Sequence, residues 1–200
     1  MRKAIILNVL FLFTYSLLFS QVESEKFFVG NVIADLSTFN DNDFVNPLPS
    51  ILDSRHKIEI RFIKEDFLTP SRFIILAYDT SWIAKHYFYD DRTKFLFSMN
   101  IKQVNLNTLF SRLVAHNIFS LPNCDSLRTG NYYYYPKKNE LKSSEITVFD
   151  GTCYFIEFKI SDKFRRYHYW SPDVYSKHYS SSSELKNFTE IVEIFNTLMN

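Results

Sequence analysis

The sequence contains little glycine, with three residues among 200. Sites that cradle phosphate groups need glycines where the backbone approaches the ligand closely, as in P-loops and dinucleotide-binding loops. No such loop is present, and no serine stands on the glycine-flanked turn of a hydrolase nucleophile. The sequence therefore disfavours a nucleotide-binding protein and lacks the common local signatures of enzymes.

Metal-binding motifs and a dominant charge are also missing. The sequence has no HExxH, no CxxC and no Asp-rich calcium loop, so we expect neither a metal nor a cofactor. Basic and acidic residues number 23 and 22, which gives no electrostatic attraction to nucleic acid or to an anionic membrane. The histidines follow no metal-ligand spacing: His56, His86, His116, His168 and His178.

Only two cysteines are present, Cys124 and Cys153. An even number in an exported chain suggests a disulfide, which would stabilise the fold by roughly 3 to 4 kcal/mol in the chain-entropy model. The alternatives are two free thiols, or a catalytic pair such as Cys124 with His116. We expect the disulfide, because Cys153 lies near a turn where a loop cysteine could reach it. Nothing nearby resembles a cysteine-nucleophile signature, which disfavours the catalytic pair.

The chain begins with the pattern of a secretory signal peptide. Arg2 and Lys3 precede an apolar run from Ala4 to Leu18, which is short for a membrane anchor and is not followed by stop-transfer charges. Cleavage after Ser20 would place residues 21–200 in the periplasm or outside the cell, without a membrane span. An uncleaved N-terminal anchor is the alternative, because Leu18 is larger than the cleavage site prefers.

Period-two alternation predicts strands along the first half of the chain. Residues 56–63 alternate apolar with charged side chains, and residues 72–78 are apolar at nearly every position, as in a central strand covered on both faces. The remaining strands are expected at 27–33, 82–89 and 94–99. Residues 21–55 as a whole give mixed signals and predict an irregular covering segment.

Two segments have helical periodicity. In residues 105–116, Asn105 can cap the N-terminus and Asn117 suits the left-handed residue that ends the helix. A final helix begins after a capping box formed by Ser181 and Glu184. Residues 123–140 predict a long loop, whose tyrosine run at 132–135 is a second candidate contact surface.

Residues 144–170 predict three antiparallel strands joined by turns at Asp150-Gly151 and Asp162-Lys163. A three-residue loop with Gly151 in the left-handed conformation places Ile146 and Val148 on the face of Tyr154, Ile156 and Phe158. A two-residue second loop turns Tyr167 and Tyr169 into the core. A loop with an odd number of residues would instead turn Arg166 into the core, and burying an unpaired charge costs several kcal/mol.

These elements define an α+β fold: an antiparallel β-sheet of about six or seven strands in two meanders, with two helices packed on one face. The expected organisation is a signal peptide at 1–20, an irregular N-terminal segment at 21–55 and a single α+β domain at 56–200.

The outer face of the strands at 144–170 is the main candidate site. Glu157 is expected opposite His168 and Phe155 opposite Trp170, with Lys159 beside Arg166. An aromatic pair beside a carboxylate, an imidazole and a guanidinium could bind a peptide, a glycan or a partner protein. The alternative is an ordinary wet sheet face, or one covered by the N-terminal segment. The candidate binding residues are Phe155, Glu157, Arg166, His168 and Trp170.

Several segments together resemble a group of uncharacterised exported proteins of Bacteroidota-type bacteria. They are Phe19-Ser20-Gln21 at the expected cut, RFIILAYDTSWIAKHYFYD, LFSRLVAHNIFSLPN, DGTCYFIEFK with RRYHYWSP, and the final amphipathic helix. The resemblance implies export and an intact domain, and it carries no activity, ligand or functional residue.

The leading functional hypothesis is an exported, non-enzymatic domain that binds an unknown protein or glycan. The alternatives are a hydrolase with scattered residues such as Glu157 and His168, and an inhibitor or immunity-like protein that blocks a partner enzyme. A deep cleft with two carboxylates, or with a carboxylate and a histidine, would favour the enzyme. A flat exposed patch would favour binding.

Overall fold

The computed structural model describes residues 47–66, 69–124, 127, 131–135, 140–144 and 146–199, with the backbone alone at 131–135 and 140–144. The predicted signal peptide, the predicted strand at 27–33 and most of the predicted covering segment lie outside these residues.

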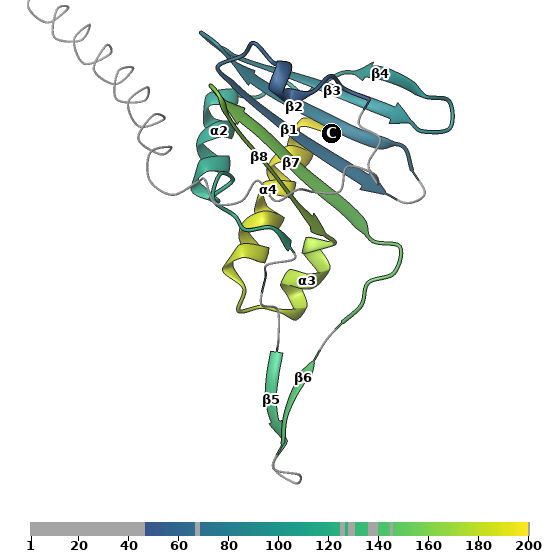
Figure 1. Cartoon of the computed structure of the whole chain (residues 1–200), viewed down its shortest axis with the longest axis vertical. Coiled ribbons are helices and arrows are strands. Elements are labelled where there is room, and N and C mark those ends of the chain that lie inside the picture. Colours follow the sequence, from purple (N-terminus) through teal and green to yellow (C-terminus); the bar gives the residue numbers. More distant parts are fainter. Residues whose placement is uncertain are drawn as a thin grey trace, which may run out of the picture. The chain divides into compact units, whose positions relative to one another are not determined.

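Six antiparallel strands form the main sheet in the part of the chain that the structure describes, in the order β4-β3-β2-β1-β7-β8 (Figure 1). The pairing of β1 with β7 joins a four-stranded meander to the β7–β8 hairpin. The predicted α+β class with an antiparallel sheet is confirmed. The strands are β1 (Ile58–Asp66), β2 (Ser71–Tyr78), β3 (Trp82–Asp90), β4 (Phe95–Met99), β7 (Thr152–Ile160) and β8 (Lys163–Trp170).

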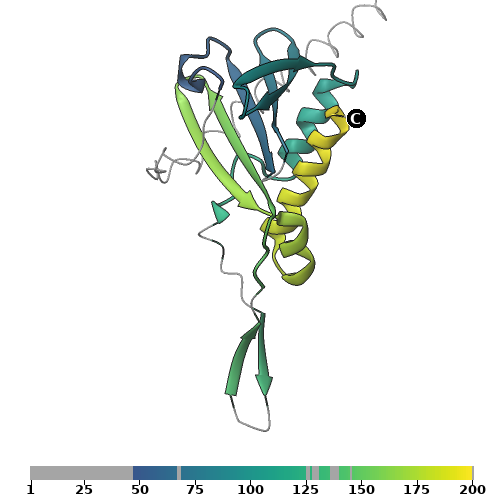
Figure 2. The same cartoon turned by 90° about the vertical axis from the view of Figure 1, so that its right-hand side faces the viewer.

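The two predicted helices, α2 (Leu106–Ala115) and α4 (Ser183–Met199), lie on the same side of the sheet (Figure 2). Asn105 caps α2 as predicted, because its Oδ1 accepts a hydrogen bond from Thr108 N at 3.1 Å. Asn117 is left-handed as predicted, with φ 60°. The cap of α4 is one residue later than expected, since Ser182 Oγ accepts from Leu185 N.

Other local elements were not predicted. The segment after β8 forms a short helix, α3 (Pro172–His178), which Pro172 favours because proline suits the first helical turn. Part of the predicted loop at 123–140 is a strand, β5 (Asn131–Tyr135), which pairs with β6 (Glu140–Ser144) in a separate two-stranded sheet. A 3-10 turn, η1 (Ile51–Asp53), precedes β1.

The predicted three-strand arrangement at 144–170 was wrong in its first strand. Both neighbours of β7 are taken, by β1 and β8, so Ile146 and Val148 do not pair with it. Asp150, rather than Gly151, takes the left-handed conformation, with φ 54°. Gly151 lies in a crowded place, because a Cβ there would lie 2.0 Å from Ser171 Oγ and 2.9 Å from Trp170 Nε1, and these side chains would have to shift.

The second turn has two residues, as predicted, but they are Ser161 and Asp162. Moving the turn by one residue shifts the β7–β8 register by two, so Tyr167 lies opposite Ile156 and Tyr169 opposite Tyr154. A shift of two preserves the faces. Tyr167 and Tyr169 are therefore buried on the helix side, as expected.

Aromatic rings join the sheet to α4. Phe195 stacks on Phe62 with ring centroids 4.5 Å apart, and Phe188 stacks on Tyr169 at 4.0 Å. Phe188 also contacts Tyr154 and Tyr167 edge-on, at 6.4 and 6.0 Å. One fully buried side chain of α4 therefore contacts both strands of the β7–β8 hairpin.

We expect Phe188→Ala to lower the free energy of unfolding by about 3 to 5 kcal/mol, because it removes a buried ring and leaves a cavity. Urea unfolding followed by circular dichroism measures the change. Phe149→Ala is the control, since Phe149 is 84% exposed and its loss should change stability by less than about 0.5 kcal/mol. Equal effects of the two substitutions would contradict this packing.

Candidate functional site

Four charged side chains of alternating sign lie across the sheet face that points away from α4: Glu59, Arg61, Glu157 and Arg166, here called the charged row. Arg61 Nε lies 2.6 Å from Glu59 Oε1, and Arg61 Nη1 lies 3.8 Å from Glu157 Oε2. Glu157 Oε1 is 3.5 Å from Arg166 Nε. Three of the four residues are buried, so each charge depends on its neighbours for compensation.

Residues 47–57, here called the N-terminal strap, bind to this row. Arg61 Nη1 donates to Pro49 O at 2.6 Å, and Ser54 Oγ donates to a carboxylate oxygen of Glu59. Lys159 Nζ donates to Leu52 O at 2.8 Å and to Ser54 O at 2.5 Å. Residues 47–55 of the strap are the described part of the predicted covering segment. Carbonyl groups of the strap accept hydrogen bonds from the basic groups of the sheet.

The five predicted binding residues share the outer face, but they do not form the expected patch. Phe155 and Glu157 are buried, and Arg166, His168 and Trp170 are half-buried. The predicted pairs were wrong because of the two-residue shift: Glu157 lies opposite Arg166, Phe155 opposite His168, and Trp170 opposite Cys153.

These side chains already have contacts within the chain. The guanidinium carbon of Arg166 lies 5.1 Å from the centre of the Phe155 ring. Trp170 Nε1 donates to Val148 O at 3.3 Å. These two side chains of the predicted site therefore make their contacts within the sheet and the segment that precedes β7.

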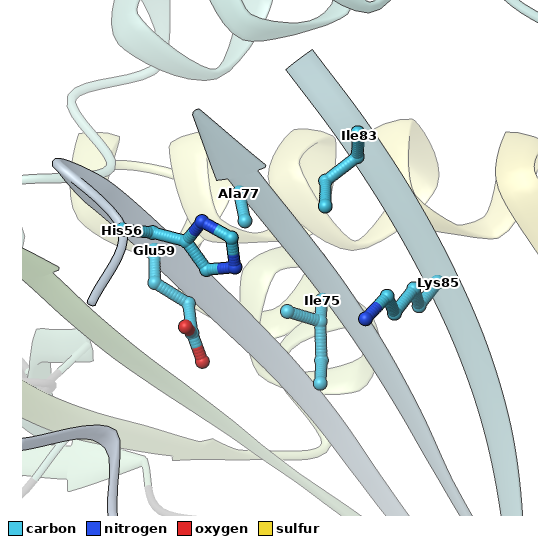
Figure 3. A pocket seen from close by; sticks show the side chains of 6 residues that line it. All are labelled: His56, Glu59, Ile75, Ala77, Ile83 and Lys85. Atoms are coloured by element: carbon cyan, nitrogen blue, oxygen red, sulfur yellow. The ribbon is translucent and has the colours of Figure 1, made fainter. Parts of the chain in front are cut away.

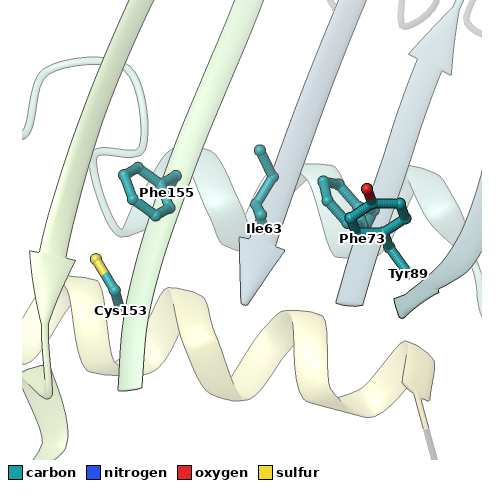
Figure 4. Packing of buried hydrophobic residues seen from close by; sticks show 5 residues of the cluster. All are labelled: Ile63, Phe73, Tyr89, Cys153 and Phe155. Atoms are coloured by element: carbon teal, nitrogen blue, oxygen red, sulfur yellow. The ribbon is translucent and has the colours of Figure 1, made fainter. Parts of the chain in front are cut away.

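A buried apolar cluster lies beside the charged row on the outer face (Figure 4). Leu48 of the strap packs on it, together with Tyr87 and Trp170. Apolar side chains thus fill both faces of the sheet at its centre. The members of the cluster are Ile63, Phe73, Tyr89, Cys153 and Phe155.

The predicted disulfide between Cys124 and Cys153 is not formed. Cys153 is buried in the apolar cluster on β7. Cys124 is half-buried and follows Asn123, whose Oδ1 accepts from His168 N of β8 at 3.1 Å.

Two carboxyl groups at the end of β1 have pKa values shifted in opposite directions. Burial raises the pKa of Glu65 from 4.5 to about 7, opposed by Arg166 and reinforced by Asp91. Burial would also raise the pKa of Asp66, but hydrogen bonds from Thr152 and then Thr69, with the charge of Lys64, lower it overall.

A small pocket opens on the outer face at the start of β1 (Figure 3). Its volume of about 80 Å³ leaves room for a few water molecules, far less than a site for an organic ligand needs. Its carboxylate, Glu59, is paired with Arg61, and His56 Nδ1 lies 2.7 Å from Asp79 Oδ2. The pocket is lined by His56, Glu59, Ile75, Ala77, Ile83 and Lys85.

Strand β4 is an edge strand, and all five of its residues are exposed. The four apolar ones are Phe95 (63% exposed), Leu96 (37%), Phe97 (49%) and Met99 (46%). We call Phe95–Met99 the β4 edge. The sequence predicted a short strand here but did not single it out, because its place at the end of the sheet depends on the strand order. The sequence feature that could have indicated an exposed edge strand is the uncharged run FLFSM at the end of the first group of predicted strands.

No protein-family model matches the sequence, and no curated protein and no solved structure was found to match it. Among the residues that the structure describes, no three His, Cys, Asp or Glu side chains are grouped as metal ligands would be. No helix within the same residues is long and apolar enough to cross a membrane.

We expect Glu65→Gln to become more stabilising, relative to the wild type, as the pH rises from about 4.5 to about 7. The raised pKa of Glu65 means that the folded wild type loses stability over this range, as a buried carboxyl must ionise. Asp66→Asn is the control, for which we expect the opposite dependence of stability on pH. The pKa of Asp66 is lowered from 3.8 in the folded protein, so the substitution should be destabilising at neutral pH and lose its effect as the pH falls below about 4. Urea unfolding at several pH values tests both, and parallel profiles for the two variants would refute the assignment.

We expect the Cys153 thiol to react slowly in the folded protein. Burial, reinforced by Glu65 and Cys124, raises its pKa from 9.0 to about 12, and the thiolate is the reactive form. Alkylation at pH 8, followed by peptide mass spectrometry, should modify half-buried Cys124 well before Cys153. In denaturant the two should react alike. Fast modification of Cys153 in the folded chain would contradict this environment.

Proposed function

We propose that this chain is an exported, non-enzymatic domain that binds a protein by taking an extended segment of its partner onto the β4 edge. The observation that carries the proposal is that an edge strand presents four exposed apolar side chains. Soluble proteins rarely leave such an edge open, because it is a template for pairing with another chain. Exposed apolar patches of this kind mark interaction sites.

A protein partner fits this surface better than a glycan. The edge of an antiparallel sheet offers backbone N–H and C=O groups in register for a further strand, and apolar side chains on it supply contact area. The small pocket at Glu59 has no room for a sugar ring with its substituents.

The hydrolase hypothesis with Glu157 and His168 gains no support from the geometry. Glu157 is in ion pairs with Arg61 and Arg166, and two neighbouring guanidinium groups favour the ionised carboxylate over a proton donor. His168 lies opposite Phe155 instead of Glu157. An inhibitor or immunity-like role remains one form of the proposed binding function.

Export is part of the proposal and is supported by the beginning of the sequence. Arg2 and Lys3 before the apolar run from Ala4 to Leu18 are typical of a signal peptide. The partner is accordingly placed in the periplasm or outside the cell.

We expect Phe97→Lys to abolish partner binding, because a lysine on the strand brings an unpaired charge to the apolar contact. Wild type and variant are each used to capture proteins from the cell envelope, and the bound proteins are compared by mass spectrometry. Phe149→Lys is the matched control, since it introduces the same charge at an exposed phenylalanine outside the β4 edge. Capture of the same proteins by wild type and by Phe97→Lys would sink the proposal.

A further inference from the structure

We infer that the partner on the β4 edge is a second copy of this chain, paired antiparallel across a two-fold axis at Phe97. The inference rests on the proposed function and names the occupant of its site. Two-fold dimers are the commonest oligomers of soluble proteins, and a two-fold axis requires a surface that is complementary to itself.

The sequence of β4 meets this requirement. Antiparallel pairing centred on Phe97 places Phe97 opposite its own copy and Phe95 opposite Met99 of the other copy. All three side chains lie on one face, because they alternate with Leu96 and Ser98. Aromatic and apolar cross-strand pairs of this kind stabilise sheets.

That face is the helix side of the sheet, beyond the area that the helices cover. Met99 pairs with buried His86, which pairs in turn with Ile74 of the core. The dimer would therefore extend the existing core layer across the axis. The rings of Phe95 and Phe97 already contact each other, with centroids 6.0 Å apart.

The features that normally protect an edge strand are missing from β4. Phe95–Met99 contains no lysine, no other charge and no proline. Within the part of the chain that the structure describes, the hydrogen bonds found for its backbone are those of its pairing with β3. The nearest charged residues on either side along the chain are Lys94 and Lys102. Lys94 Nζ is paired with Asp91 Oδ1 at 2.5 Å, within the turn before β4.

The loop after α2 contacts β8, the strand at the opposite edge of the sheet. Arg165 donates to Phe119 O at 2.9 Å and to Leu121 O at 2.5 Å, so the loop after α2 lies against β8. Asn123 Oδ1 accepts from the backbone N of His168 on the same edge. Part of that edge is therefore covered within the chain. A two-fold pair formed through β4 is closed in any case, because the axis uses the same strand of each copy.

The contact area indicates a weak dimer. A fully exposed aromatic or long apolar side chain presents about 200 Å², so the exposed fractions of the four apolar residues of β4 give about 400 Å² per copy. The pair would bury about 800 Å², below the 1,200 to 2,000 Å² typical of stable complexes. We expect a dissociation constant weaker than about 1 µM.

Sedimentation equilibrium of the chain as the cell exports it, from about 10 µM to about 1 mM, tests the inference. The wild type and the Phe149→Lys control should dimerise in this range. Phe97→Lys should remain monomeric, because the substitution places two ammonium groups opposite each other at the axis. Thermal unfolding verifies that each variant is folded. A wild type that is monomeric at about 1 mM, or a Phe97→Lys variant that dimerises normally, overturns the inference.

A cross-link tests the position of the axis. Directly opposite residues of an antiparallel pair have Cα atoms about 4.5 to 5.5 Å apart, within the range of a disulfide. Mild oxidation should therefore link two copies of Phe97→Cys, and not two copies of Phe95→Cys, which faces Met99. Oxidised wild type gives the background from Cys124 and Cys153. Failure of Phe97→Cys to cross-link above this background refutes the two-fold pairing.

The two proposals fail in different ways. If the wild type stays monomeric while Phe97→Lys loses an envelope protein, the partner is a different chain and the proposed function stands. If the wild type stays monomeric and Phe97→Lys captures the same proteins as the wild type, both fail. Dimerisation that is lost in Phe97→Lys supports both, with the second copy as the partner.

Discussion

Side-chain alternation along β7 is the constraint on which the rest of the structure depends. Tyr154, Ile156 and Phe158 point to the helices, and Cys153, Phe155 and Glu157 point to the other face. Strand β7 pairs with β1 on one side and with β8 on the other. The alternation of its side chains therefore determines which residues of all three strands share a face of the sheet. This alternation places the aromatic side chains of β7 under α4 and Glu157 in the charged row.

The charged row requires a cover of a particular kind. Buried ion pairs lose hydration that their attraction alone rarely recovers, so they need further hydrogen bonds. The N-terminal strap provides them with carbonyl oxygens, at Pro49 for Arg61 and at Leu52 and Ser54 for Lys159. The strap is therefore a structural part of the sheet, and its place on the outer face leaves β4, at the far edge, as the exposed apolar strand.

Local periodicity was sufficient to predict most elements of the fold from the sequence. It found α2 and α4 and all six strands of the main sheet, and turn parity placed Tyr167 and Tyr169 inside. Pairing between distant segments could not be read in this way. A neighbour for β7 was sought in the adjacent residues 144–148, whereas the actual neighbour, β1, lies far upstream. The surroundings of the expected binding surface could not be read in this way either, because no local pattern indicates that residues 47–57 return to the outer face and bind Glu59, Arg61 and Lys159.

The union of β1 with β7 has a kinetic consequence. Asp66 and Thr152, which are hydrogen-bonded at the end of this strand pair, are 86 positions apart in the sequence. The strands β1 and β7 can therefore pair only after the long segment between them has been ordered. Translation delivers the amino-terminal meander first, and one side of β1 then stays open until β7 has been synthesised. Until then the nascent chain exposes the unpaired edges of two strands, β1 and β4. Pairing with β7 covers the edge of β1, whereas the edge of β4 is still exposed in the folded sheet. A slow final step of folding, in which β7 pairs with β1, is what this topology predicts.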